Sequence, residues 1–134
     1  MIRRSAYIEA EGDQATFHPP MSWKFIRLEL ASTGEFPAGS VGRAYLIRLP
    51  LDDRDHVDTV ALDSTPHRAT FRRHWSAEPD EHGQITRHGH QLEMGLNGST
   101  RILRIDDRPV RLGEHVSVED HDGSILPFRI ASIR

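Results

Sequence analysis

Residues 23–31 read Trp-Lys-Phe-Ile-Arg-Leu-Glu-Leu-Ala, and apolar and charged side chains alternate from position 26 to position 30. In an extended chain, successive side chains point to opposite faces. The three aliphatic side chains of this stretch therefore share one face, and Arg27 and Glu29 share the other. This alternation predicts a half-buried β-strand with a solvated outer face.

Similar short runs recur along the whole chain, with turn residues between them. The predicted strands cover residues 6–10, 15–17, 23–31, 43–51, 68–75, 101–105, 116–118 and 125–133, and a hairpin over 84–94 adds two more. Asn97-Gly98 is the strongest turn signal, because a two-residue hairpin turn needs positive φ at both central residues. Helical spacing of Val57, Val60 and Ala61 predicts one short helix, capped by Asp55 and ending at Pro66, although a strand fits this segment almost as well.

The pattern predicts a mostly β protein: a small antiparallel β-barrel or sandwich of about ten short strands with at most one short helix. With 134 residues, no linker and no repeat, residues 1–134 are expected to form a single β domain. Strand order, and barrel against sandwich, stay open. An exposed edge strand would favour a homo-oligomer.

Composition narrows the function classes. The net charge is −3, and Lys24 is the only lysine, so positive charge is almost all arginine. An acidic balance predicts no nucleic-acid partner, because non-specific binding to a polyanion needs a basic surface. The chain has no cysteine, no signal-peptide pattern and no apolar run of membrane-spanning length, which predicts a cytoplasmic protein that does not cross a membrane.

Nine histidines are the first unusual feature. His88-Gly89-His90 is followed by Glu93, and His115 lies further on; imidazole and carboxylate groups of this kind could hold a divalent metal. The stretch resembles the first motif of the cupin family, which has two histidines one residue apart and then a glutamate. The resemblance implies a divalent metal as cofactor and enzymatic activity. A hairpin turn at Gly89, with both histidines at the surface, is the alternative.

Two arginines spaced by four are the second feature. Arg68 and Arg72, followed by Asn97 and Ser99, resemble the motif of PilZ domains, although Ile102 replaces the motif's glycine. The resemblance implies a β-barrel that binds cyclic di-GMP through these four residues. Alternatively, residues four apart in a strand share a face, so the two arginines would form a solvated outer face.

No glycine-flanked serine marks a nucleophile elbow, and adjacent acidic pairs fit solvated turns better than catalysis. The two tryptophans are expected in the core or at a barrel end, and the alternative is that they line a ligand pocket. The leading hypothesis is therefore a non-enzymatic β-barrel module that binds an unidentified small molecule or protein. The metal-binding and cyclic-dinucleotide readings remain as alternatives.

Overall fold

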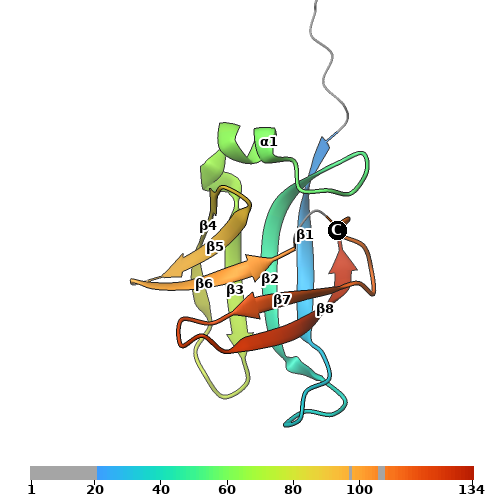
Figure 1. Cartoon of the computed structure of the whole chain (residues 1–134), viewed down its shortest axis with the longest axis vertical. Helices are drawn as coiled ribbons and strands as arrows, with labels where there is room; N and C mark the ends of the chain where they lie inside the picture. Colours follow the sequence, from blue (N-terminus) through green and yellow to red (C-terminus); the bar gives the residue numbers. More distant parts are fainter. Residues whose placement is uncertain (1–20, 97, 106–107) are drawn as a thin grey trace, which may run out of the picture.

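The structure is a computed structural model and describes residues 21–96, 98–105 and 108–134. Eight antiparallel strands follow one another around a closed barrel, and β8 pairs with β1 to close it (Figure 1). The elements are β1 (Met21–Leu30), β2 (Ser40–Asp52), α1 (Thr59–Ser64), the 3-10 turn η1 (Pro66–Arg68), β3 (Thr70–Trp75), β4 (Glu81–His88), β5 (Gln91–Leu96), β6 (Ser99–Arg104), β7 (His115–Glu119) and β8 (Ile125–Ile133).

These eight strands confirm the mostly β prediction and settle the choice between barrel and sandwich. The other two predicted strands, 6–10 and 15–17, and the turn between them lie outside the described residues. Within the strands the structure describes, closure leaves no free edge for another chain to pair with.

The short helix is present, but its boundaries differ from the prediction. Asp58, not Asp55, caps α1, because its side chain accepts a hydrogen bond from the Ala61 N–H at 3.0 Å. Asp55 instead adopts a positive φ in the preceding turn. Pro66 opens η1 after the helix, so Arg68 belongs to η1 and not to a strand. As Figure 1 shows, α1 lies over one end of the barrel.

Alternation places the aliphatic side chains inside the barrel. In β1 the even positions from Ile26 to Leu30 are at most 4% exposed. Tyr45, Ile47 and Leu49 of the neighbouring strand β2 lie beside them on the same inward face and are equally buried. Each such side chain removed from water contributes about 1.5–3 kcal/mol to folding, so this inward face holds the barrel together.

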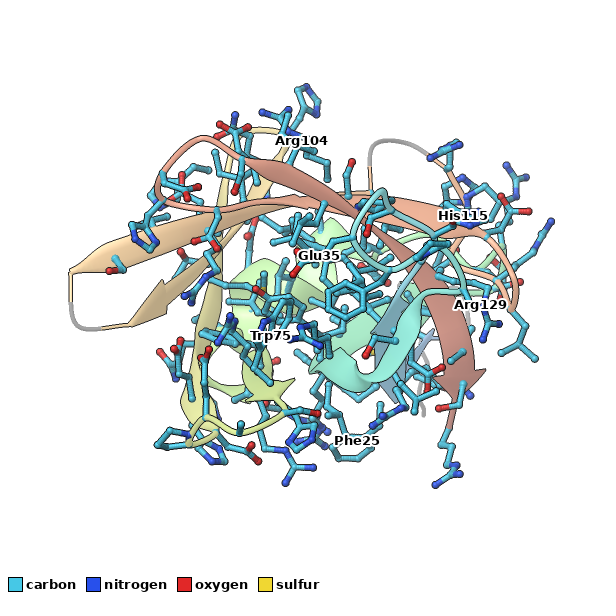
Figure 2. The ribbon with its side chains drawn as sticks, turned by 90° about the horizontal axis from the view of Figure 1, so that it is seen from below. Phe25, Glu35, Trp75, Arg104, His115 and Arg129 are labelled. Atoms are coloured by element: carbon cyan, nitrogen blue, oxygen red, sulfur yellow. The ribbon has the colours of Figure 1, made fainter. Side chains whose placement is uncertain are left out.

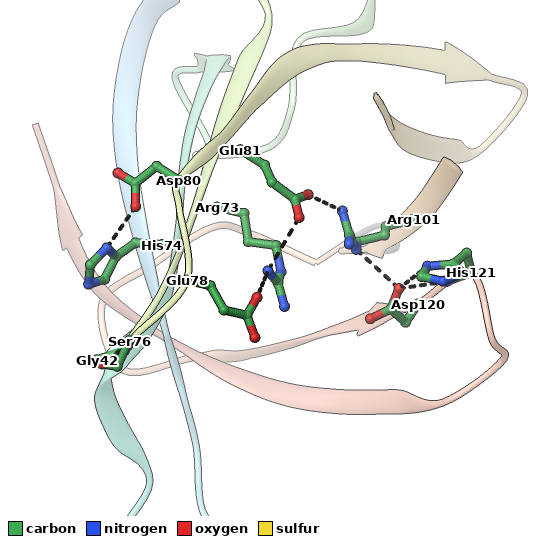
Figure 3. Close-up of polar contacts among 10 residues, drawn as sticks. All are labelled: Gly42, Arg73, His74, Ser76, Glu78, Asp80, Glu81, Arg101, Asp120 and His121. Carbon is green, nitrogen blue, oxygen red and sulfur yellow. Dashed lines mark hydrogen bonds and ion pairs between the residues drawn. The ribbon is translucent and has the colours of Figure 1, made fainter. Parts of the chain in front are cut away.

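One part of the interior is polar. Arg73 of β3 and Arg101 of β6 are only 8% and 6% exposed. Glu81 of β4 reaches both, with Oε1 2.9 Å from Arg101 Nη1 and Oε2 3.5 Å from Arg73 Nη1 (Figure 3). Asp120 adds a second contact to Arg101 at 3.1 Å, and Glu78 a second contact to Arg73 at 3.3 Å. This set of five residues is called the interior ion network below.

Aromatic rings pack beside the interior ion network. The Trp75 ring lies 4.0 Å under the Arg73 guanidinium and contacts Tyr45 and Phe128 edge-on or tilted. Burial raises the pKa of the Tyr45 phenol above its usual value, although the nearby charges of Arg101 and Arg73 oppose this. Tyr45 is therefore a neutral hydroxyl inside the barrel at ordinary pH.

Candidate functional site

The outer, solvent-facing side of β1–β4 carries aromatic and arginine side chains. Its strands are in register, so outward-facing residues form rows across the sheet. One row holds Phe25, Arg48, Thr70 and Gln84, and the next holds Arg27, Leu46, Arg72 and His82. The rows thus place Phe25 beside Arg48 and put an arginine on the outer face of each of β1, β2 and β3.

Two arginines stack on aromatic rings here, Arg48 of β2 and Arg68 of η1, which directly precedes β3. The Arg68 guanidinium lies 4.5 Å from the centre of the Trp23 ring. Arg48 lies 5.6 Å from the centre of Trp23 and 5.1 Å from that of Phe25. Arg68, Trp23, Arg48 and Phe25 therefore form a continuous series, called here the arginine–aromatic ladder. Each stacked pair is worth about 0.5–1 kcal/mol at an exposed site.

The ladder arginines lack the usual partners. Among the described residues, neither Arg48 nor Arg68 forms an ion pair with a carboxylate. The Arg48 Nε is buried and has no hydrogen-bond partner there. A guanidinium whose face rests on a ring keeps its N–H edge available for an anion. The ladder is therefore held in place by its rings and not neutralised.

Two grooves flank the ladder. The helix groove, of about 760 Å³, runs between Trp23, Arg68 and the α1 segment around Val60. The sheet groove, of about 470 Å³, is lined by Phe25, Leu46, Arg48, Thr70, Arg72 and His82, among others. Both volumes fall in the range of about 300–1,000 Å³ that small-molecule sites occupy.

Apolar side chains near the ladder are unusually open. Phe25 is 59% exposed, Val60 is 68% exposed and Met21 is 40% exposed. Figure 2 shows Phe25 on the outside of the barrel, whereas Trp75 lies toward the middle. Exposed apolar groups gathered beside a groove indicate an interaction surface more often than scattered ones do.

An acidic group borders the sheet groove. Asp80 accepts a hydrogen bond from His74 Nδ1 at 2.9 Å and lies 3.8 Å from Arg72 Nε. The His74 hydrogen bond, with the positive charges around it, lowers the pKa of Asp80 below its usual value. Asp80 is therefore ionised at neutral pH, and it is the acidic side chain that an anion would displace from Arg72.

The residues of the PilZ-like prediction are only partly brought together. Arg68 and Arg72 both border the ladder, Arg68 in the helix groove and Arg72 in the sheet groove. Ser99 lies at the start of β6, separated from β3 by two intervening strands. Asn97 lies outside the described residues. The arginine pair therefore stands on one candidate surface without Ser99.

The residues of the metal-site prediction are also spread out. His88 and His90 flank the β4–β5 turn at Gly89, and His88 Nε2 lies 3.6 Å from Glu93 Oε1 across that hairpin. His115 is in β7, in register with Arg129 of β8, and lines a different groove. Among the described residues, no three histidine or carboxylate side chains lie together as a metal site requires.

The sequence pattern did not single out Phe25 or Arg48, and it predicted Trp23 in the core or at a barrel end, with a ligand pocket as the alternative. Trp23 is partly buried and packs against the core, but it also lines the helix groove. The alternation of side chains in the strand could have indicated these residues, because positions 23 and 25 fall on the same outer face as Arg27. The contact with Arg48 depends on strand register, which the alternation alone does not give.

No helix within the described residues is long and apolar enough to cross a membrane. Comparisons with models of protein families, with curated proteins and with solved structures found no match to this chain.

Proposed function

We propose that this protein is a non-enzymatic binding module and that the outer face of β1–β4, centred on the arginine–aromatic ladder, binds a small anionic ligand. The observation that carries the proposal is the state of Arg48 and Arg68. Both guanidiniums are positioned by aromatic rings, and neither is neutralised by a carboxylate among the described residues.

Charge favours a small anion over a polymer. The protein carries a net charge of −3, so a long polyanion would meet repulsion beyond the ladder itself. A compact anion contacts only the local arginines and avoids that repulsion. Cyclic di-GMP, which the Arg68 and Arg72 spacing suggests, is one such anion and belongs in the first set of ligands to test.

The two tryptophans allow a direct binding assay. Trp23 belongs to the ladder and Trp75 to the barrel interior, so a Trp75→Phe variant reports on Trp23 alone. Titration with pyrophosphate, cyclic di-GMP and mononucleotides should change Trp23 fluorescence saturably for at least one of them. Arg48→Gln should weaken that binding at least tenfold, because a charge-assisted contact is worth about 1.5–3 kcal/mol.

Arg104→Gln is the matched control. Arg104 lies in β6, on the opposite side of the barrel from Phe25 in Figure 2, and contacts Glu119 at 2.5 Å. The Arg104→Gln substitution removes one positive charge, as Arg48→Gln does, but from a remote surface. The affinity for the anion should therefore change little. Equal losses for the Arg48 and Arg104 variants would mean that overall charge governs binding and that the ladder is not the site.

A further inference from the structure

The sheet groove has features that specify its ligand more closely than charge alone. Arg48 and Arg72 sit on neighbouring strands, offset by two residues along them, since Arg48 is in register with Thr70. Such diagonal neighbours lie about 7–8 Å apart, and their Cβ atoms are somewhat closer than that. Two long arginines at this spacing can converge on one tetrahedral anion from two sides, which is how guanidinium groups hold phosphate.

Two further hydrogen-bond donors lie at the anion end of the groove. Thr70 is in register with Arg48 and lies two residues before Arg72 on the same face, and His82 is in register with Arg72. A hydroxyl and an imidazole at these positions can each donate a hydrogen bond to a phosphate oxygen. The nearest opposing charge is Asp80, whose 3.8 Å contact with Arg72 is longer than its 2.9 Å contact with His74.

An aromatic ring, that of Phe25, lines the other end of the sheet groove. Phe25 lines the groove beside Arg48, and its 59% exposure leaves a large part of the ring in solvent. An exposed ring next to a phosphate-binding pair suits a ligand that has a planar ring attached to a phosphate. Stacking of such a ring is expected to improve affinity by about tenfold, a typical value for one base on one aromatic side chain.

We infer that the sheet groove binds a nucleotide-like ligand, with its phosphate between Arg48 and Arg72 and its planar ring against Phe25. This inference rests on the proposed function, because it assigns the anion of that surface to one chemical class. The groove volume of about 470 Å³ suits a ligand of mononucleotide size.

The test compares AMP with its two halves. Adenosine, inorganic phosphate and AMP are titrated by calorimetry into the full chain. AMP should bind at least tenfold more tightly than either half. Phe25→Leu should reduce AMP affinity and leave phosphate affinity unchanged, whereas Arg72→Gln should reduce both.

Asp80→Asn gives a change in the opposite direction. Removing this carboxylate frees Arg72 from its only ion-pair partner among the described residues, so AMP should bind more tightly, by up to about fivefold. Asp122→Asn is the matched control. Asp122 is also exposed, but it belongs to the β7–β8 turn, where its side chain accepts a hydrogen bond from the Ser124 N–H. Tighter AMP binding by the Asp80→Asn variant, with no change in the Asp122→Asn variant, supports the placement of the phosphate beside Arg72.

Each failure points to a different error. If pyrophosphate binds as tightly as AMP and the Phe25 variant is unchanged, the surface binds anions, but the nucleotide assignment is wrong. If a single-stranded oligonucleotide binds far more tightly than AMP, the ligand is a polymer and the inference is overturned. If neither AMP nor pyrophosphate nor cyclic di-GMP binds, both the inference and the proposed function fail.

Discussion

Replacing Glu81 by glutamine tests whether the interior ion network stabilises the barrel. Among the described residues, Glu81 is the one carboxylate that contacts both buried arginines, at 2.9 Å to Arg101 and 3.5 Å to Arg73. Glutamine keeps the size of the side chain but removes its charge. The two guanidiniums would then depend on their second partners, Asp120 and Glu78.

The magnitude follows from burial. Breaking a fully buried ion pair from one side costs about 3–5 kcal/mol. Here the arginine side chains are 8–9% exposed, but that of Glu81 is 30% exposed, so water screens part of the loss. Because each arginine also keeps one carboxylate, we expect the free energy of unfolding to fall by about 2–3 kcal/mol.

Urea unfolding followed by circular dichroism measures this change. The matched control is Asp63→Asn, which removes a carboxylate that lies 2.5 Å from Arg87 in a more exposed pair. A surface pair contributes about 0–1 kcal/mol, so the control should remain near the parent protein. If the two variants lose the same stability, the network is solvated and the interior placement of Arg73 and Arg101 is refuted.

Three further predictions concern stability, pH and metal. Gly83→Ala should destabilise the barrel by about 1–3 kcal/mol, measured by urea unfolding, because a Cβ there would lie 2.6 Å from the Phe71 ring and from a backbone carbonyl oxygen; unchanged stability would contradict this packing. Burial raises the pKa of Asp120, but hydrogen bonds and a neighbouring guanidinium hold it below its usual value, so its contribution is complete above about pH 5 and is lost as pH falls below about 4. Thermal melts from pH 3 to 7 should show this loss, and an Asp120→Asn variant should show a smaller one. If the β4–β5 hairpin holds a divalent metal, elemental analysis of untagged protein will find it in near-stoichiometric amount, and His88→Ala with His90→Ala will remove it; metal retained by this double variant would exclude the site.

The strand pattern could be predicted because burial in a barrel has a period of two. Positions 26, 28 and 30 alternate with charged residues and are buried as expected. The same rule put position 73 on the inner face with Phe71, but an arginine there breaks the apolar pattern. Its burial makes sense only once Glu81 and Glu78 are seen beside it, and these contacts come from another strand and a loop.

Closure of the barrel was not predictable from alternation. Each strand's apolar face says that it covers a core, but it does not say which strand edges pair. The pairing of β8 with β1 joins residues about one hundred positions apart, such as Leu28 with Ile130. An open sandwich made from the same strands would bury the same alternating faces, so only tertiary structure decides between them.

Only part of the candidate site could be predicted from the sequence, for a similar reason. The four-residue spacing of Arg68 and Arg72 predicted that they bind a ligand, and the structure places both beside the ladder. Trp23 and Arg48 are 25 positions apart and meet only through the register of β1 with β2. A cation–ring contact between two strands leaves no local signal in either of them.

The closed fold itself explains why the proposed binding surface lies on the outside of the barrel. Tyr45, Phe128 and the interior ion network occupy space inside the barrel, and α1 lies over one end. A ligand inside would have to displace buried rings and paired charges, each at a cost of several kcal/mol. On the outer face of β1–β4, by contrast, Phe25 is already exposed and Arg48 already lacks an acidic partner among the described residues. An anion bound there gains contacts without breaking any part of the core, so the outer face is the part of this barrel that can bind a ligand at least expense to stability.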